Sequence, residues 1–418
     1  MSQVCALYAH TCVIDGALVT YRTVAMFPRM AILLPPAPRR ELFDDEHEDY
    51  RASFRQFVER EVIPDFPEWE KAQLVPRELF TKAAAHGFLA MEVPEEHGGS
   101  GVADWRFNVV LSEEAARYGV GDAIAGPLLH TDVVLPYIMA AASEEQKERW
   151  LPGIASGERI LAVAMTEPGT GSDLAAIKTR AVLDGDHYVV NGGKTFITNG
   201  INADLVVVAV RTSDDRHGGL SMLVIEREME GFTRGSQIEK VGQHASDTAE
   251  LFFDDVRVPV ENRLGEEGSG FLQLVSRLVP ERLTLAVSSM AGAEAAFELT
   301  LDYIKERKAF GKPIGSFQNS RFLMADLKTE IVMTRAFIDR TIQRYVDGTA
   351  TVEEAAMAKL QTTELLCKMT DVGVQLHGGY GYTTEYPIAK AWVDARITKI
   401  YAGTNEIMKE LIGRGMGL

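Results

Sequence analysis

The feature that most constrains the fold of this chain is a hydrophobic period that changes twice. From residue 41 to about 155, apolar side chains such as Phe54 and Phe57 recur at spacings of three and four, which predicts amphipathic helices. From 160 to about 260 the pattern becomes short β-branched or aromatic runs separated by Asp-Gly, Asn-Gly and Gly-Gly turns, which predicts antiparallel strands. Beyond about 270 the helical spacing returns and continues to the end of the chain.

The last region predicts unusually long helices. Apolar residues mark one helix from Leu283 to Ile304, a second from Leu323 to Ile342, and a third from Val352 to Val374. Helices, then a sheet, then helices near bundle length indicate an α+β fold. We expect four segments: an extra N-terminal segment (1–40), an N-terminal α domain (41–158), a middle antiparallel β domain (159–262) and a C-terminal domain that resembles a four-helix bundle (263–418).

The leading forty residues and the composition limit the class of protein. Asp15 and Arg22 interrupt the apolar start, so a signal peptide is poorly supported. Met26 and Met30 could be alternative starts, in which case residues 1–40 are a floppy tail or no part of the native protein. No run reaches the roughly 20 apolar residues of a membrane span.

A formal charge of −17 argues against binding to nucleic acid, which requires clustered Lys and Arg. Three scattered cysteines suit a reducing compartment, so we expect a cytoplasmic location rather than a mitochondrial matrix one.

Several short motifs could carry chemistry. A polar, Gly-bearing loop (165–173) follows a predicted strand, and Phe196 lies between two turns in 191–200. A third motif ends a helix with Gly378-Gly379, and Thr404 is placed to cap the last helix, whose N-terminus could receive a pyrophosphate. Taken singly, each motif could equally belong to an ordinary turn or helix end.

Taken together and in this order, the motifs make the chain resemble the acyl-CoA dehydrogenase family. The strings are A-M-T-E-P-x-x-G-S-D, N-G-x-K-x-F-I-T-N-G, E-R-K-A-F-G-K, Q-L-H-G-G-x-G-Y and G-T-N-E-I, in that sequence. The resemblance covers about nine-tenths of the chain, from residue 41 to the C-terminus. It implies bound FAD between the β domain and the C-terminal helices, an acyl-CoA substrate, and a homo-oligomer, usually a tetramer.

The resemblance also implies roles for individual residues. In the subunit's own cofactor site it places Met165, Thr166, Gly171, Ser172, Phe196, Thr198, Thr404 and Glu406. At the FAD of the adjacent subunit it places Arg307, Phe310, Gln318, Gln375, Leu376, Gly378 and Gly379. Around the thioester it places Ser172 again, with Leu278, Arg282, Ala402 and Gly403.

The expected base departs from the commoner family pattern. Many members carry a catalytic Glu in a Tyr-Glu-Gly-Thr string, where this chain has Ala402, and alanine cannot take a proton. Members that resemble isovaleryl-CoA and long-chain acyl-CoA dehydrogenases carry the base in a Glu-Arg-Leu string on the long helix, and this chain has Glu281-Arg282-Leu283. We therefore expect Glu281 to remove the α proton. A first-turn Glu that merely favours the helix dipole is the alternative.

The implied reaction converts an acyl-CoA to a trans-2-enoyl-CoA, with the β hydride passing to FAD and then to an electron-transferring flavoprotein. The backbone N–H of Ala402 would stabilise charge on the thioester oxygen. An acyl-CoA oxidase and a non-catalytic CoA-thioester-binding paralogue are the alternatives. The motifs favour a medium-to-long straight or modified acyl chain, with branched-chain and steroid side-chain thioesters left open.

Overall fold

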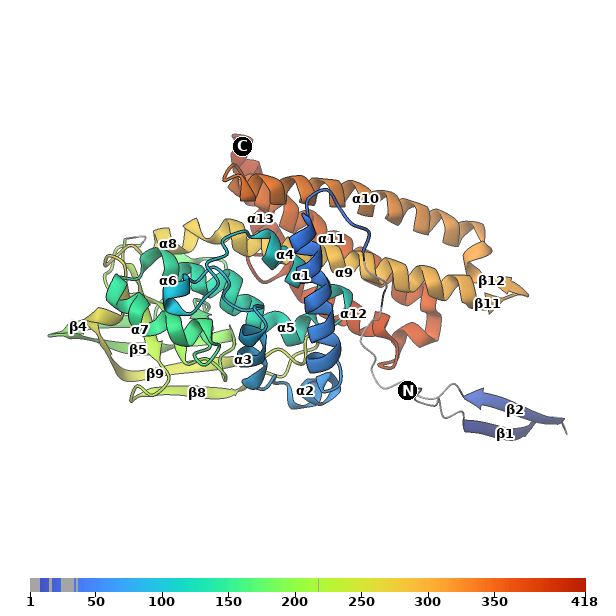
Figure 1. Cartoon of the computed structure of the whole chain (residues 1–418), viewed down its shortest axis with the longest axis horizontal. Helices are drawn as coiled ribbons and strands as arrows, with labels where there is room; N and C mark the ends of the chain where they lie inside the picture. Colours follow the sequence, from blue (N-terminus) through green and yellow to red (C-terminus); the bar gives the residue numbers. More distant parts are fainter. Residues whose placement is uncertain (1–7, 15–16, 24–33, 35–36, 217) are drawn as a thin grey trace.

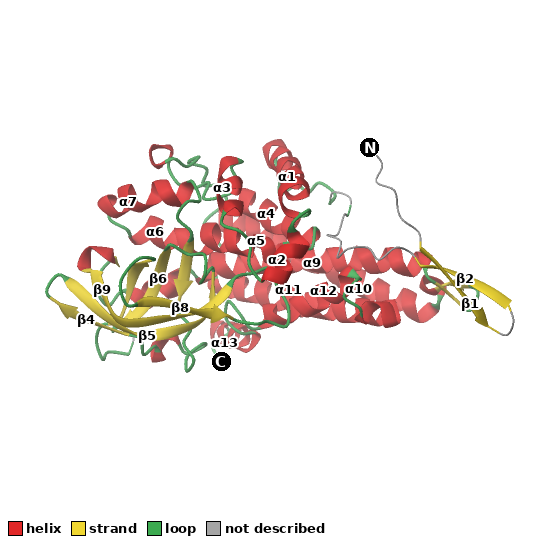
Figure 2. Ribbon diagram, turned by 90° about the horizontal axis from the view of Figure 1, so that it is seen from below, coloured by secondary structure: helices red, strands yellow, loops and turns green. Residues whose placement is uncertain are grey.

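The computed structural model describes residues 8–14, 17–23, 34, 37–216 and 218–418. Within them, the strands of the middle sheet gather at one end of an elongated molecule and the long helices at the other, with shorter helices packed alongside and β1 and β2 beyond the helical end (Figures 1 and 2). In the leading segment, β1 (Tyr8–Ile14) pairs antiparallel with β2 (Ala17–Thr23). At the end of the expected tail, Leu34 is buried and packs with Ala295, and Arg40 pairs with Glu113 and Asp339. Residues 1–7, 15–16, 24–33 and 35–36 lie outside the described part, and for them the expectation stays a prediction.

The N-terminal region is helical, as predicted. It contains α1 (Asp45–Phe57), the π-helical turn η1 (Val58–Val62), α2 (Phe66–Ala72), α3 (Glu78–Ala85), η2 (Glu95–His97), α4 (Arg106–Arg117), α5 (Gly121–Leu128), the π-helical turn η3 (Leu129–Val134), α6 (Leu135–Ala141) and α7 (Glu144–Ala155). Contrary to the expectation from the sequence, the run Gly121–Ala141 is apolar and long enough, by length and composition alone, to cross a membrane. Most of its apolar window (61%) is buried inside the fold, as the core helix of a globular domain would be.

The middle region is one twisted sheet in the order β10-β7-β6-β4-β5-β9-β8, with β3 paired to β6. The pairs are antiparallel, as predicted, except that β3 runs parallel to β6 and β4 meets β6 through a parallel bridge. The strands are β3 (Leu161–Ala164), β4 (Arg180–Asp184), β5 (His187–Thr198), β6 (Leu205–Arg211), β7 (Leu220–Glu226), β8 (Phe232–Gln237), β9 (Thr248–Pro259) and β10 (Arg263–Leu264). Short helical turns flank them at η4 (Leu174–Ala176) and η5 (Val260–Asn262).

Strand β6 is buried on both faces and joins two cores. Leu205, Val207 and Ala209 pack with the N-terminal helices, while Val206 and Val208 pack within the sheet domain. Because successive side chains of a strand point to opposite faces, one continuous apolar run serves both cores. The sheet is thereby fixed against the N-terminal helices.

The C-terminal region holds the long helices, which lie side by side in both views (Figures 1 and 2). Helix α11 packs chiefly against α9, and α4 of the N-terminal region also packs on α9. The elements are α8 (Gly270–Ser276), α9 (Leu278–Glu306), β11 (Lys308–Ala309), β12 (Lys312–Pro313), η6 (Ile314–Ser316), α10 (Gln318–Val346), α11 (Val352–His377), η7 (Gly378–Tyr382), α12 (Pro387–Ala395), η8 (Arg396–Lys399) and α13 (Asn405–Gly415).

Local sequence explains where these helices begin. Thr351 accepts from the backbone N–H of Glu354, whose side chain accepts in return from the N–H of Thr351, so this capping box starts α11. Pro387 occupies the first turn of α12, where its missing N–H has no cost. The hydroxyl of Thr404 caps α13, as the sequence predicts.

Candidate active site

Glu281 lies in the first turn of α9 and is buried, with 8% of its surface exposed. The hydroxyl of Tyr137, on α6, donates a hydrogen bond of 2.9 Å to its Oε1. Tyr137 is itself 1% exposed. The two residues are far apart in sequence, so the contact exists only because the N-terminal helices pack against α9.

Burial raises the pKa of Glu281 to about 7, since desolvation disfavours the charged carboxylate. The bond from Tyr137 and the charges of Arg282 and Arg277 act in the opposite direction and moderate the rise. A carboxyl group with a pKa near 7 is half ionised near neutral pH. It can therefore accept a proton more readily than a solvent-exposed Glu.

Arg282 follows Glu281 and is 2% exposed. Its Nε and Nη1 have no hydrogen-bond partner within the described part of the chain. Burial lowers the pKa of Arg282, and Glu281 opposes this effect. Buried N–H groups of a guanidinium are costly to leave unpaired, so their presence here indicates that a ligand or water completes the site.

The turn 401–404 is strained and firmly held. Ala402 has φ of +50° and Gly403 has φ of +85°, a left-handed conformation that alanine adopts only under constraint. Lys359, fully buried on α11, donates to the carbonyl of Gly403 and to Oδ1 of Asn405, both at 2.8 Å. The lysine therefore ties the turn to the long helices. Sequence reasoning missed both Tyr137 and Lys359.

The loop that follows β3 is also fixed by a buried lysine. Lys194 on β5 donates to the carbonyl of Met165 at 3.1 Å and pairs with Glu167 at 2.9 Å. Thr166 accepts from the backbone N–H of Thr195 at 2.9 Å. The backbone of this loop is thus held by β5, whereas Ser172, farther along it, is exposed.

Phe196 lies on the same strand β5 as this lysine. Its side chain is 64% exposed and its backbone is left-handed, with φ of +60°. The register of β5 against β9 shifts between Lys194 and Ile197, and Thr198, beyond this irregularity, is half-buried. A large uncovered aromatic ring on a held strand is suited to stack on a planar ligand.

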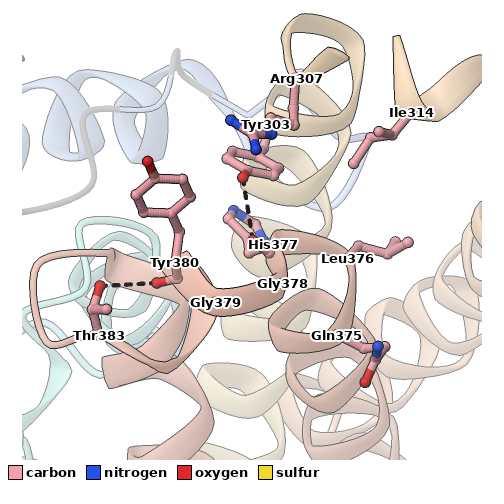
Figure 3. Close-up of a pocket in the computed structure, with 10 residues that line it drawn as sticks. All are labelled: Tyr303, Arg307, Ile314, Gln375, Leu376, His377, Gly378, Gly379, Tyr380 and Thr383. Atoms are coloured by element: carbon pink, nitrogen blue, oxygen red, sulfur yellow. Dashed lines mark hydrogen bonds between the residues drawn. The ribbon is translucent and has the colours of Figure 1, made fainter. Parts of the chain in front are cut away.

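The C-terminal motif residues meet at a cavity of about 400 Å³ between the ends of α9 and α11 (Figure 3). Five predicted residues line it: Arg307, Gln375, Leu376, Gly378 and Gly379. A hydrogen bond of 3.2 Å from the Tyr303 hydroxyl to the His377 carbonyl closes one side.

Two predicted residues stand apart from that cavity. Phe310 is 95% exposed, at the tip between β11 and β12, with φ of +52°. Gln318 begins α10 and is not among the residues that line the cavity. Of the remaining predicted residues, Leu278 starts α9, one turn before Glu281, and Glu406 is exposed in the first turn of α13.

Family models cover nearly all of the chain beyond its leading segment. The acyl-CoA dehydrogenase N-terminal, middle and C-terminal domains match residues 44–158, 162–256 and 268–417. The chain is 45% identical over 378 residues to the mitochondrial long-chain specific acyl-CoA dehydrogenase of Sus scrofa, covering 90% of this chain and 87% of that protein.

Two further similarities agree with this match. The mitochondrial isobutyryl-CoA dehydrogenase of Bos taurus is 35% identical, over 91% of this chain and 90% of its own length. The crystal structure of an acyl-CoA dehydrogenase from Geobacillus kaustophilus aligns with a TM-score of 0.89 at 48% identity, covering 91% of this chain and all of that one (100%).

Proposed function

Because this chain belongs to the acyl-CoA dehydrogenase family and is an oxidoreductase that acts on acyl-CoA, we propose that it forms trans-2-enoyl-CoA with FAD as cofactor and Glu281 as base. The observation that carries the proposal is the state of Glu281: it is buried, it accepts one hydrogen bond from Tyr137, and burial raises its pKa to about 7. Since position 402 is alanine, Glu281 has no competing carboxylate in that turn.

The proton to be removed is weakly acidic because it lies next to a thioester carbonyl. A carboxylate that is shielded from water and raised in basicity can accept it. The strained backbone at Ala402, tied down by Lys359 through Gly403, supports a role for its N–H as a donor to the thioester oxygen. Holding both groups on packed elements reduces the entropy cost of bringing them to the substrate.

The residues present fit a flavin. Phe196 offers an uncovered aromatic face, the capped N-terminus of α13 at Thr404 is suited to a diphosphate, and added Cβ atoms at Gly378 and Gly379 would meet nothing within 4 Å. When bound, FAD supplies the acceptor for the hydride that leaves the β carbon.

The fully exposed Phe310 supports the proposal that this hairpin reaches the FAD of a second subunit in a homo-oligomer, which we expect to be a tetramer. An electron-transferring flavoprotein is the proposed acceptor for the electrons. Anaerobic reduction followed by either oxygen or ferrocenium as oxidant separates this reaction from that of an acyl-CoA oxidase.

The central test compares Glu281→Gln with the wild type in anaerobic titrations of the FAD-loaded enzyme. We expect the variant to keep the flavin spectrum but to lose acyl-CoA-dependent bleaching by about 10²–10⁴-fold in rate. Asp302→Asn, an acid-to-amide change at an exposed position of the same helix, is the control and should bleach normally. Turnover retained in full by Glu281→Gln would overturn the assignment.

A further inference from the structure

We propose that Lys390, on α12, is a positioning residue for the proposed reaction. It holds the loop 238–247, which joins β8 to β9, between the strand end expected at the flavin and the turn expected at the thioester. The proposal rests on the function given above, because that function assigns those two contacts. It predicts that loss of Lys390 slows flavin reduction even at saturating thioester.

Lys390 lies among three carboxylates from three helices. Its Nζ lies 3.0 Å from Oδ2 of Asp122 on α5, 2.6 Å from Oδ2 of Asp394 on α12 itself, and 3.3 Å from Oε1 of Glu70 on α2. Glu70 and Asp122 are buried. Burial acts to lower the pKa of Lys390, but the three carboxylates outweigh it and raise that pKa, so the lysine stays charged. One cation therefore joins the N-terminal helices to α12.

Two of these carboxylates hold the loop through its backbone. Oδ1 of Asp394 accepts from the backbone N–H of Gln243, and Oδ2 of Asp122 accepts from the N–H of Ala245 at 3.1 Å. The backbone of Gln243 is left-handed, with φ of +50°, and a Cβ at Gly242 would lie 2.8 Å from Oδ1 of Asp394. A strained loop of this kind persists only where its surroundings fix it, and here the two carboxylates do so.

At one side the loop braces the end of β5. The carboxylate of Asp247 accepts from the backbone N–H of Ile201 at 3.0 Å and from that of Asn202 at 2.8 Å. The carbonyl of Asp247 accepts from the N–H of Asn199 at 3.2 Å, and β9, which starts directly after the loop, pairs with Thr198. Thr198 is one of the residues expected at the flavin. A shift of the loop would therefore displace this strand end.

At the other side the loop braces the segment that leads into the turn 401–404. Nε2 of Gln243 donates to the Tyr401 hydroxyl at 3.4 Å. The loop also bonds to α12, as described above, and only η8 and one residue separate α12 from Tyr401. Ala402, whose N–H is the proposed donor to the thioester oxygen, comes next. Lys359 holds this turn from α11, and the loop supplies a second restraint from the opposite side of the sequence.

These restraints matter because hydride transfer requires the flavin and the thioester to be held at a fixed separation. Without Lys390, the carboxylates of Glu70, Asp122 and Asp394 would lose their shared counter-charge and repel one another. The loop would then relax, and β5 and the turn would shift relative to each other. A misplacement of about 1 Å can lower the rate of a chemical step about 10²-fold. The loss should therefore fall on the rate more than on binding.

The experiment measures anaerobic bleaching of the FAD-loaded enzyme by the straight-chain acyl-CoA that reduces the wild type fastest. The saturating rate per bound FAD and the half-saturating concentration are compared in Lys390→Met and Gln243→Leu, with Tm recorded. The second variant keeps every charge and removes the side-chain bond to Tyr401. Arg335→Met is the control for the lysine, since Arg335 is a buried cation among carboxylates of α4, α9 and α10. Gln343→Leu, at an exposed position of α10, is the control for the amide.

We expect the saturating rate to fall about tenfold or more in Lys390→Met and about threefold or more in Gln243→Leu, with the half-saturating concentration changed less than about twofold. Arg335→Met should lose Tm but keep its rate, and Gln343→Leu should keep both. A loss confined to Tm or FAD content, or an equal loss of rate in the controls, would overturn the inference. Should Lys390→Met fail to fold, a rate in Gln243→Leu within about twofold of wild type overturns it. If no thioester bleaches the wild type, the proposed function fails and this inference fails with it.

Discussion

Tyr137→Phe tests how the protein sets the basicity of Glu281. The substitution removes one hydroxyl, which donates to Oε1 of Glu281 at 2.9 Å, and keeps the ring that fills the core. A donor stabilises the ionised carboxylate, so its loss should raise the pKa of Glu281 above its present value of about 7. The acid limb of the rate profile should therefore move to higher pH.

The magnitude follows from the strength of such a bond. A hydrogen bond to a charged group contributes about 1.5–3 kcal/mol, and a pKa change of 1 corresponds to about 1.36 kcal/mol. The pKa of Glu281 should therefore rise by about 1–2. At neutral pH the ionised fraction would fall from about one half to between about a tenth and a hundredth. We expect kcat/KM there to fall about 5- to 50-fold, with recovery at alkaline pH.

The assay is kcat/KM against pH, because that ratio reports the ionisation of the free enzyme. Tyr118→Phe is the matched control: Tyr118 is equally buried and donates to Oε1 of Glu59 at 2.6 Å, away from the site. The control should leave the acid limb in place. An acid limb that stays unchanged in Tyr137→Phe, or moves to lower pH, would refute the reasoning.

Three further predictions concern stability and positioning. Burial raises the pKa of Glu281 from 4.5 to about 7, so ionisation of this group destabilises the folded state by about 3 kcal/mol. The destabilisation is absent at low pH and develops as the pH rises from about 4.5 to above 7. Glu281→Gln should accordingly have a higher Tm than wild type at about pH 8, and a much smaller difference at about pH 5. An equal gain in Tm at both pH values would contradict the upward direction of the pKa shift. Lys359→Met should loosen the turn at Gly403 and lower kcat about tenfold or more with little change in Tm, whereas unchanged kinetics would exclude a positioning role. Arg335→Met should lower the free energy of unfolding in urea by about 3–5 kcal/mol, because it removes a 2.8 Å ion pair from the buried Glu113. A loss under about 1 kcal/mol would show that neighbouring charges rearrange to compensate for the missing arginine.

The sequence predicts the three-region fold and the long helices because their periodicity is strong. Within the predicted β region, strands β4 and β8 have little signal in the sequence, because each buries a single residue, Ala181 and Phe232, and so lacks an alternating pattern. The segment of α5 and α6 is predicted only as part of a helical region, without bounds of its own. Pro127 lies inside α5, whereas Pro136 lies in the first turn of α6, where its missing N–H has no cost. In both cases tertiary packing, not local pattern, decides the structure.

The candidate site was predictable only in part. The motif strings identify residues that lie on loops and helix ends, and the structure brings five of them to one cavity. Tyr137 and Lys359 belong to no motif, and each reaches its partner through a contact between residues distant in sequence. Such pairings depend on how helices dock, which a single sequence does not reveal.

Glu281, the proposed proton acceptor, and Tyr137, whose hydroxyl donates to it, come from different regions of the polypeptide. Tyr137 belongs to the N-terminal helices and Glu281 to the C-terminal ones. The pKa of Glu281 depends on its burial and on the bond from Tyr137, so an exchange of one helical region between proteins would change that pKa unless the contact were kept. In the proposed mechanism, the contact between the two helical regions therefore helps to set the basicity of Glu281.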